Sequence, residues 1–269
     1  MGEGIRIGNQ TAFHAPPLEP FRYAVSRGFD AFEWFPDKRE SGAGWTETDL
    51  GPESRAWIRE TARERGIRLS VHAPWYASPV EERGFELLAG SVSFAEEIGA
   101  ALVNIHLAPR GDIRAFATAV LPLLDRVGSA DLRLSLENTP ETGPADFEAL
   151  FEELEGQGAS AARAAGLCLD VGHANLWSGS RNNYLRFVDL CMHVPIIHVH
   201  LHENYGDADT HLPAFTGPSA LDPSGMEGLV SRLKRRAFRG SVILEQWPQP
   251  PELLDRARAR LLELFASSG

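Results

Sequence analysis

Short runs of apolar or β-branched residues alternate with longer amphipathic segments along the whole chain, and this alternation constrains the fold more than any other feature. The segments between the runs carry apolar residues at helical spacing, so the pattern predicts an α/β protein. The expected strands are 5–8, 31–35, 68–72, 102–106, 132–137, 167–170, 196–200 and 242–245. The expected helices are 52–65, 82–98, 113–127, 146–155, 226–236 and 251–265.

Eight strands alternating with helices in 269 residues predict one (β/α)8 TIM barrel that spans residues 1–269. A doubly wound open sheet is the alternative. The first run is followed by Gly8-Asn-Gln-Thr-Ala-Phe instead of the glycine fingerprint of a Rossmann fold, which favours the barrel. Gly66, Gly99 and Gly128 follow three of the expected helices, where a left-handed helix terminus suits glycine.

The charge balance and the cysteine content exclude several classes of protein. The chain has 26 Lys and Arg against 37 Asp and Glu, so its formal net charge of −11 disfavours broad attraction to nucleic acid or anionic membranes. No apolar stretch approaches the roughly 20 residues of a membrane helix, and Met1-Gly-Glu-Gly-Ile-Arg lacks the apolar core of a secretory signal. With only Cys168 and Cys191, no disulfide framework is expected. We therefore expect a cytoplasmic protein without a membrane partner, and a homo-oligomer is compatible with these features.

Six consecutive expected strands, beginning with the third, end in a histidine or a carboxylate. These residues are His72, His106, Glu137, Asp170, His200 and Glu245. Three further side chains of the same kinds follow in the adjoining segments: His173, Asp209 and His211. Because a closed parallel barrel brings the carboxyl ends of its strands to one mouth, we expect all nine side chains to gather there.

Five imidazoles and four carboxylates at one mouth would repel one another or stay unpaired unless cations lie among them. Neutral imidazole and carboxylate are the natural ligands of zinc and manganese. Nine donors exceed one coordination sphere and, with bridging carboxylates, would suit two or three ions. The sequence therefore predicts a site for Zn²⁺ or Mn²⁺ at the mouth, with one to three ions as the range.

Other residues are expected near this mouth. Four tryptophans could lay an indole face against the C–H face of a sugar: Trp34, Trp75, Trp177 and Trp247. Glu203 could hold a metal ion or a substrate hydroxyl. His198 and His202 share a face with His200 by strand alternation, so they either orient a ligand or fill the barrel interior.

The chain resembles the xylose-isomerase-like TIM-barrel superfamily along nearly its whole length. The runs that carry the resemblance, in order, are Ser70-Val-His-Ala-Pro, Val103-Asn-Ile-His, Leu136-Glu-Asn-Thr, Leu169-Asp-Val-Gly-His-Ala-Asn, His198-Val-His-Leu and Val242-Ile-Leu-Glu. This superfamily includes sugar-phosphate isomerases and epimerases, and also the endonuclease IV group of AP endonucleases. The resemblance supports the barrel and the metal site, and it leaves the reaction open.

One reaction that the resemblance implies is isomerisation or epimerisation of a ketose, another polyol or a sugar phosphate. It places the main metal ion on Glu137, Asp170, His200 and Glu245, with His173 near the substrate. A metal chelated by adjacent substrate oxygens polarises the carbonyl and acidifies the neighbouring C–H. Glu137 and Glu245 would then move the proton through an enediolate.

The alternative is phosphodiester cleavage at abasic DNA sites. Endonuclease IV relatives hold three zinc ions, and all nine donors named above match their ligand positions. Trp75 and Tyr76 could act as a wedge in a base stack, and Lys38 and Arg39 could contact phosphate.

Three features depart from the endonuclease pattern. After His211 the chain reads Leu-Pro-Ala-Phe-Thr-Gly-Pro-Ser where that group has Ser-Leu-Gly-Glu-Gly, and His200-Leu-His-Glu-Asn stands where His-Leu-Asn-Asp is expected. Few basic residues fall in the segments after the strands, the main ones being Lys38, Arg39, Arg110 and Arg181. An isomerase or epimerase is therefore the preferred expectation. Another metal-dependent lyase or dehydratase, or a binding barrel without catalysis, stays open.

Overall fold

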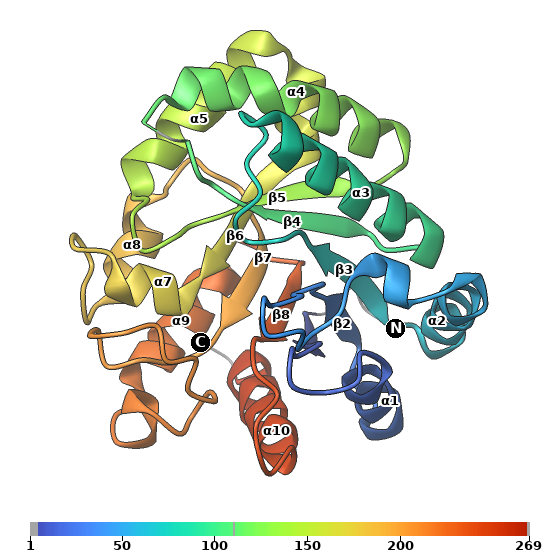
Figure 1. The fold of residues 1–269 in the computed structure, drawn as a ribbon. Coiled ribbons are helices and arrows are strands. Elements are labelled where there is room, and N and C mark those ends of the chain that lie inside the picture. Colours follow the sequence, from blue (N-terminus) through green and yellow to red (C-terminus); the bar gives the residue numbers. More distant parts are fainter. Residues whose placement is uncertain (1–4, 110, 268–269) are drawn as a thin grey trace.

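Eight parallel strands close into a barrel in the order of the chain, and the helices surround them (Figure 1). The computed structural model describes residues 5–109 and 111–267, so Arg110 lies outside the described residues. The strands are β1 (Arg6–Gln10), β2 (Ala31–Trp34), β3 (Arg68–His72), β4 (Leu102–His106), β5 (Arg133–Glu137), β6 (Ala165–Asp170), β7 (Ile196–Leu201) and β8 (Ser241–Leu244). Pairing of β1 with β8 completes the ring, which confirms the predicted TIM barrel and excludes the open sheet.

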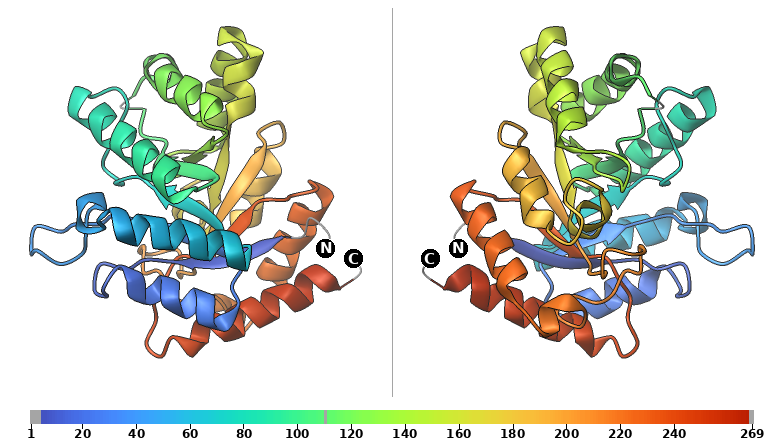
Figure 2. Two further views of the ribbon diagram at one scale, coloured as in Figure 1. Left: turned by 90° about the vertical axis from the view of Figure 1, so that its right-hand side faces the viewer. Right: turned by 90° about the vertical axis from the view of Figure 1, so that its left-hand side faces the viewer.

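The helices cover the outside of the ring. They are α1 (Leu18–Arg27), α2 (Pro52–Arg65), α3 (Glu82–Ile98), α4 (Ile113–Ser129), α5 (Pro144–Gln157), α6 (Ala159–Ala164), α7 (Val171–Leu176), α8 (Tyr184–Leu190), α9 (Ser224–Arg235) and α10 (Glu252–Ala266). Two short 3₁₀ helices are η1 (Glu47–Asp49) and η2 (Pro218–Ala220). In side view the start of β1 and the end of α10 lie at the same end of the barrel (Figure 2). Within the described residues, no helix is both long enough and apolar enough to span a bilayer.

Two of the three predicted helix-terminal glycines are confirmed. Gly66 and Gly99 adopt φ of 67° and 70°, and their N–H groups bond back to carbonyls of the preceding turn. The prediction for Gly128 is wrong, because α4 continues through Ser129 and ends on Ala130. The expected helices do not include α1, α6, α7 and α8.

Successive side chains of β2 enter two different environments, as strand alternation requires. Glu33 points into the barrel, where it contacts residues of β3 and β7. Trp34 points outward into the layer beneath the helices, and its ring lies 5.2 Å from that of Phe21 and 6.4 Å from that of Phe94. Trp34 is fully buried in this apolar layer. The prediction that Trp34 contacts substrate at the mouth is therefore wrong, because its ring lies on the other side of the sheet.

Candidate metal centre

The register of neighbouring strands brings the predicted donors side by side. His106 on β4 is the partner of Glu137 on β5, and Asp170 on β6 is the partner of His200 on β7. All of these pairs stand at the carboxyl ends of parallel strands, so their side chains converge inside the mouth. Together with His72 and Glu245, they form what we call the strand-end group.

Glu137 lies at the centre of the strand-end group and is fully buried. Its carboxylate oxygens lie 3.1 Å from Nε2 of His72, 3.4 Å from Nε2 of His106 and 3.3 Å from Nδ1 of His173. The side-chain amide of Asn104 also donates a hydrogen bond to this carboxylate. Burial alone would raise the pKa of Glu137, but the surrounding histidines hold it well below the ordinary value. Glu137 is therefore an anion ringed by nitrogen atoms.

His200 faces three carboxylates with one ring nitrogen. Its Nδ1 lies 3.2 Å from Oε2 of Glu137, 3.5 Å from Oε1 of Glu245 and 3.9 Å from Oδ2 of Asp170. All four side chains are buried. Burial lowers the pKa of His200, but nearby anionic groups outweigh burial and raise it well above the ordinary value.

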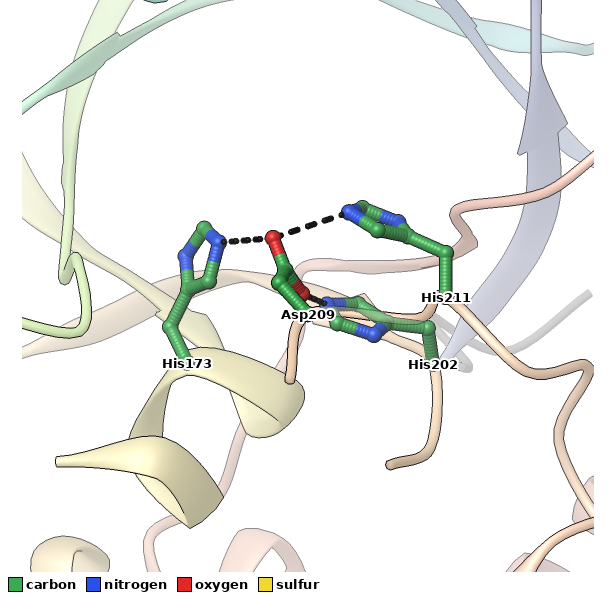
Figure 3. Close-up of side chains that lie close together, drawn as sticks. All are labelled: His173, His202, Asp209 and His211. Atoms are coloured by element: carbon green, nitrogen blue, oxygen red, sulfur yellow. Dashed lines mark hydrogen bonds and ion pairs between the residues drawn. The ribbon is translucent and has the colours of Figure 1, made fainter. Parts of the chain in front are cut away.

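Figure 3 shows a second group of donors, His173, His202, Asp209 and His211, which we call the loop group. It lies beside the first group, since Nδ1 of His173 is 3.3 Å from Oε1 of Glu137. Oδ2 of Asp209 lies 3.3 Å from Nε2 of His173 and 3.3 Å from Nε2 of His211. Oδ1 of Asp209 lies 3.7 Å from Nε2 of His202, whose ring stacks on that of His211 at 3.9 Å between centroids. Asp209 thus joins three histidines.

The local backbone explains how two members of the loop group are placed. Oδ1 of Asp170 accepts a hydrogen bond from the backbone N–H of His173 at 2.6 Å, which caps α7 and orients its first turn. Gly172 leaves room for the imidazole of His202, because a Cβ at Gly172 would stand 1.9 Å from Cε1 of that ring. The run Asp-Val-Gly-His therefore shapes both groups.

The residues present fit divalent cations. Several buried polar atoms have no hydrogen-bond partner within the described chain: Oε1 of Glu137, Oδ2 of Asp170, both ring nitrogens of His200, both ring nitrogens of His202, Oε2 of Glu245 and Oε1 of Glu33. Unpaired buried polar atoms are costly unless a ligand completes them. Two donors bound about 2.0–2.1 Å from a tetrahedral zinc ion stand about 3.3 Å apart, and the separations above run from 3.1 to 3.9 Å. Zn²⁺ and Mn²⁺ both suit this donor set.

A cavity of about 1130 Å³ opens above the two groups. Its floor includes His72, His106, His173 and Glu245, whereas Glu137 and Asp170 do not line it. Five aromatic side chains besides the histidines line its walls: Phe13, Phe35, Trp75, Tyr76 and Trp247. Of the four predicted tryptophans, the structure thus brings Trp75 and Trp247 to the cavity.

Trp177 and Glu203 lie elsewhere, which corrects their predicted contact with substrate. Trp177 packs edge-on against Phe187 at 5.8 Å, outside the cavity. The carboxylate of Glu203 binds the chain itself, since it accepts hydrogen bonds from the backbone N–H groups of Phe215 (2.7 Å) and Ser219 (3.1 Å). These bonds fix the segment that follows β7 and carries Asp209.

The sequence-based prediction missed Glu33, which lies inside the barrel with Oε1 2.8 Å from Nε2 of His200. Its one signal was a lone charge within the apolar run Ala31-Phe-Glu-Trp. The two histidines left undecided are also placed: Nε2 of His198 lies 2.9 Å from Glu33, and Nε2 of His202 lies 3.2 Å from Asp170. Both histidines therefore contact a group next to His200.

Comparisons with known proteins agree with this architecture. A D-tagatose 3-epimerase-like protein is similar in structure with a TM-score of 0.75 and 18% identity, over 97% of this chain and 98% of that chain. A D-psicose 3-epimerase determined in the presence of D-fructose gives 0.71 and 13%, over 98% and 100%. A protein from Thermus thermophilus, TTHB071, soaked with ZnCl₂, gives 0.67 and 20%, over 98% and 100%. At these identities the similarity shows the fold.

A comparison with curated protein sequences finds no match. Residues 21–264 match the family described as xylose isomerase-like TIM barrel, which covers nearly all of the closed barrel and every donor of both groups. The chain belongs to the xylose isomerase-like TIM barrel family.

Proposed function

We propose that the protein is a metal-dependent isomerase or epimerase of a sugar, a related polyol or a sugar phosphate. The observation that carries this proposal is the buried strand-end group beneath an aromatic cavity, with Glu245 at the boundary between the two. The structural similarity to sugar epimerases supports the same class.

Glu137, Asp170, His200 and Glu245 would hold the catalytic metal ion. When bound, Zn²⁺ or Mn²⁺ supplies a Lewis acid that polarises a substrate carbonyl and acidifies the adjacent C–H. The aromatic side chains of the wall, Trp75 and Trp247 among them, offer apolar faces to the sugar ring carbons. A cavity of about 1130 Å³ is large enough for a monosaccharide or its phosphate.

Glu245 is the carboxylate placed to take the proton from carbon, because it lines the cavity. In the metal-free protein burial raises the pKa of Glu245, Asp170 and Glu137 add to this effect, and His200 and His211 oppose it. The product of this step is the substrate enediolate, with the proton on Glu245.

Glu137 is the second carboxylate in the proposal: it would first gain a proton from solvent and return it to the opposite face of the substrate, while Glu245 releases to solvent the proton that it took. The contacts of Glu137 with His106 and His173 enclose it, so this role requires those contacts to open. His173 lines the cavity, and its Nδ1 lies 2.8 Å from the backbone carbonyl of Asn138. His173 is thus held where it can contact a substrate hydroxyl.

The loop group favours one second candidate, a multi-zinc phosphodiesterase that acts on abasic DNA. Its four donors stand next to the strand-end group, as hydroxide generation by clustered metals requires. Trp75 and Tyr76 are 57% and 53% exposed at the rim and are free to meet a base stack. Against this candidate, Arg39 is the one arginine or lysine among the described residues that line the cavity, and it is paired with Asp37 at 2.9 Å.

The test follows deuterium from solvent into the C–H positions of a panel of ketoses and ketose phosphates, with protein loaded with Zn²⁺ or Mn²⁺. We expect exchange in the wild type and in the Glu141→Gln control, whose carboxylate lies exposed at the cavity rim. Glu245→Gln should lower the rate by roughly 10²–10⁴-fold, with metal content measured in the same samples. Nicking of an abasic-site duplex without any exchange would reverse the assignment.

A further inference from the structure

A carboxylate is buried inside the barrel beneath the strand-end group, away from the cavity. Glu33 has no exposed surface, and its Oε2 accepts hydrogen bonds from Oγ of Ser70 at 2.8 Å and from Nε2 of His198 at 2.9 Å. Its other oxygen, Oε1, lies 2.8 Å from Nε2 of His200. Two partners on one oxygen fix the direction of the carboxylate, and the second oxygen is left for His200.

The two ring nitrogens of His200 therefore face different surroundings. Nε2 faces Glu33 in the barrel interior, whereas Nδ1 faces Glu137 and Glu245 at 3.2 and 3.5 Å. The ring itself is held between neighbours, since it stacks on His72 at 5.5 Å and meets His198 edge-on at 5.2 Å. A flip of the ring would turn Nε2 away from its carboxylate.

We propose that Glu33 is a positioning residue for the metal site, which rests on the metal role of His200 proposed above. Oε1 of Glu33, 2.8 Å from Nε2 of His200, favours the proton on that nitrogen, so that the lone pair of the neutral ring would stand on Nδ1, which faces Glu137 and Glu245. A histidine that donates its second ring N–H to a carboxylate has a fixed tautomer and is a better metal ligand. Glu33 acts through His200 and does not touch substrate.

A simple core ion pair between Glu33 and His198 is the competing explanation. Such a pair would contribute to the free energy of unfolding and leave metal affinity unchanged. The position of Oε1 argues against this explanation. Oε1 faces His200, whereas His198 and Ser70 both contact the other oxygen, Oε2. Burial of a carboxylate is unfavourable, and the second oxygen of this one is directed at a predicted metal ligand.

The first measurement needs no substitution at Glu33. Wild-type protein labelled with ¹⁵N-histidine and loaded with ¹¹³Cd²⁺ should show a one-bond cadmium coupling at Nδ1 of His200 and a bound proton at Nε2. The His200 signals are assigned by their loss in His200→Asn. Coupling at Nε2 would overturn the proposal, and this result does not depend on whether any Glu33 variant folds.

The second measurement compares zinc affinities by chelator competition. Glu33→Met removes both acceptors at similar length and should weaken zinc binding roughly 10–100-fold, while Glu33→Gln, which keeps one acceptor oxygen, should recover much of the loss. Ser70→Ala removes one of the two contacts of Oε2 and leaves that of His198, so it should weaken zinc binding far less than Glu33→Met does. A folded Glu33→Met protein with wild-type affinity would overturn the role of Glu33 and leave the isomerase proposal intact. A wild type that binds no zinc would overturn both.

Discussion

Nε2 of His173 lies 3.3 Å from Oδ2 of Asp209, and the other nitrogen of the same ring lies 3.3 Å from Oε1 of Glu137. His173 therefore joins the loop group to the strand-end group. The two groups are carried by different parts of the fold, because Glu137 is the last residue of a barrel strand whereas Asp209 lies on the segment after β7. This difference lets each group be altered separately.

Asp209→Asn should remove an ion from the loop group alone. Its carboxylate lies between His173, His202 and His211, so the amide removes the one anionic ligand that belongs to the loop group. Elemental analysis at saturating zinc should then find about one ion fewer per chain, with sugar exchange retained. Asp207→Asn, an exposed neighbour on the same segment, is the control. Equal zinc content in Asp209→Asn and wild type would contradict a metal role for the loop group.

Glu137→Gln should abolish the strand-end site. The substitution removes the negative charge at the centre of His72, His106 and His200, and it adds a donor N–H₂ among nitrogen atoms. We expect zinc affinity at this site to fall by at least about 100-fold, or roughly 2.7 kcal/mol. Chelator competition measures the loss, and near-UV circular dichroism verifies the fold. Unchanged affinity would place the metal elsewhere.

Zinc binding should release protons and strengthen as pH rises. Burial lowers the pKa of His211, but Asp209 and Glu245 raise it to about 9, so this ring carries a proton at neutral pH in the metal-free protein. Zinc binds the neutral ring, so the proton must leave, and affinity should increase up to about pH 9 by roughly tenfold per unit for each proton displaced.

Calorimetry in buffers of different ionisation enthalpy counts these protons. His211→Gln should release about one proton fewer than the wild type, whereas His14→Gln, an exposed histidine of the cavity wall, should behave as the wild type. A binding enthalpy independent of buffer would show that the rings are already neutral.

Trp34 and Trp75 were both predicted to contact substrate, but substitution of each should affect a different property of the protein. Trp34→Ala empties a fully buried site between the sheet and the helices and should lower the free energy of unfolding by roughly 3–5 kcal/mol. Trp75→Ala changes an exposed rim residue and should alter that free energy by less than about 0.5 kcal/mol while raising KM for the sugar. Urea titrations give the first quantity and steady-state kinetics the second. A stable Trp34→Ala protein with a raised KM would restore the original assignment.

The elements were predictable where local signals agree. The bounds of β3, β4, α2 and α3 match the predicted ranges, because apolar runs and helical spacing meet clear terminators such as Gly66. Helix α4 extends past Gly128 because backbone hydrogen bonds continue through its last turn, and a glycine inside a helix is tolerated. Helix α1 was missed because Pro17 and Pro20 interrupt its first turn, although proline is tolerated there.

The sequence predicted which residues stand at the strand ends, but it did not predict which side chains point into the barrel and which point outward. Which side chain of β2 enters the barrel depends on how the sheet closes and on the stagger between neighbouring strands. The local sequence Ala31-Phe-Glu-Trp determines neither. Trp34 was therefore assigned to the mouth, and Glu33 was passed over. Glu203 was misassigned for a related reason, since the donors that occupy it lie more than ten residues away at Phe215 and Ser219.

The carboxylate of Glu203 anchors the surface segment on which Asp209 and His211 stand, whereas the strand-end group stands at the ends of the barrel strands. Replacing this one tethered segment would therefore change Asp209 and His211 and leave the donors at the strand ends in place.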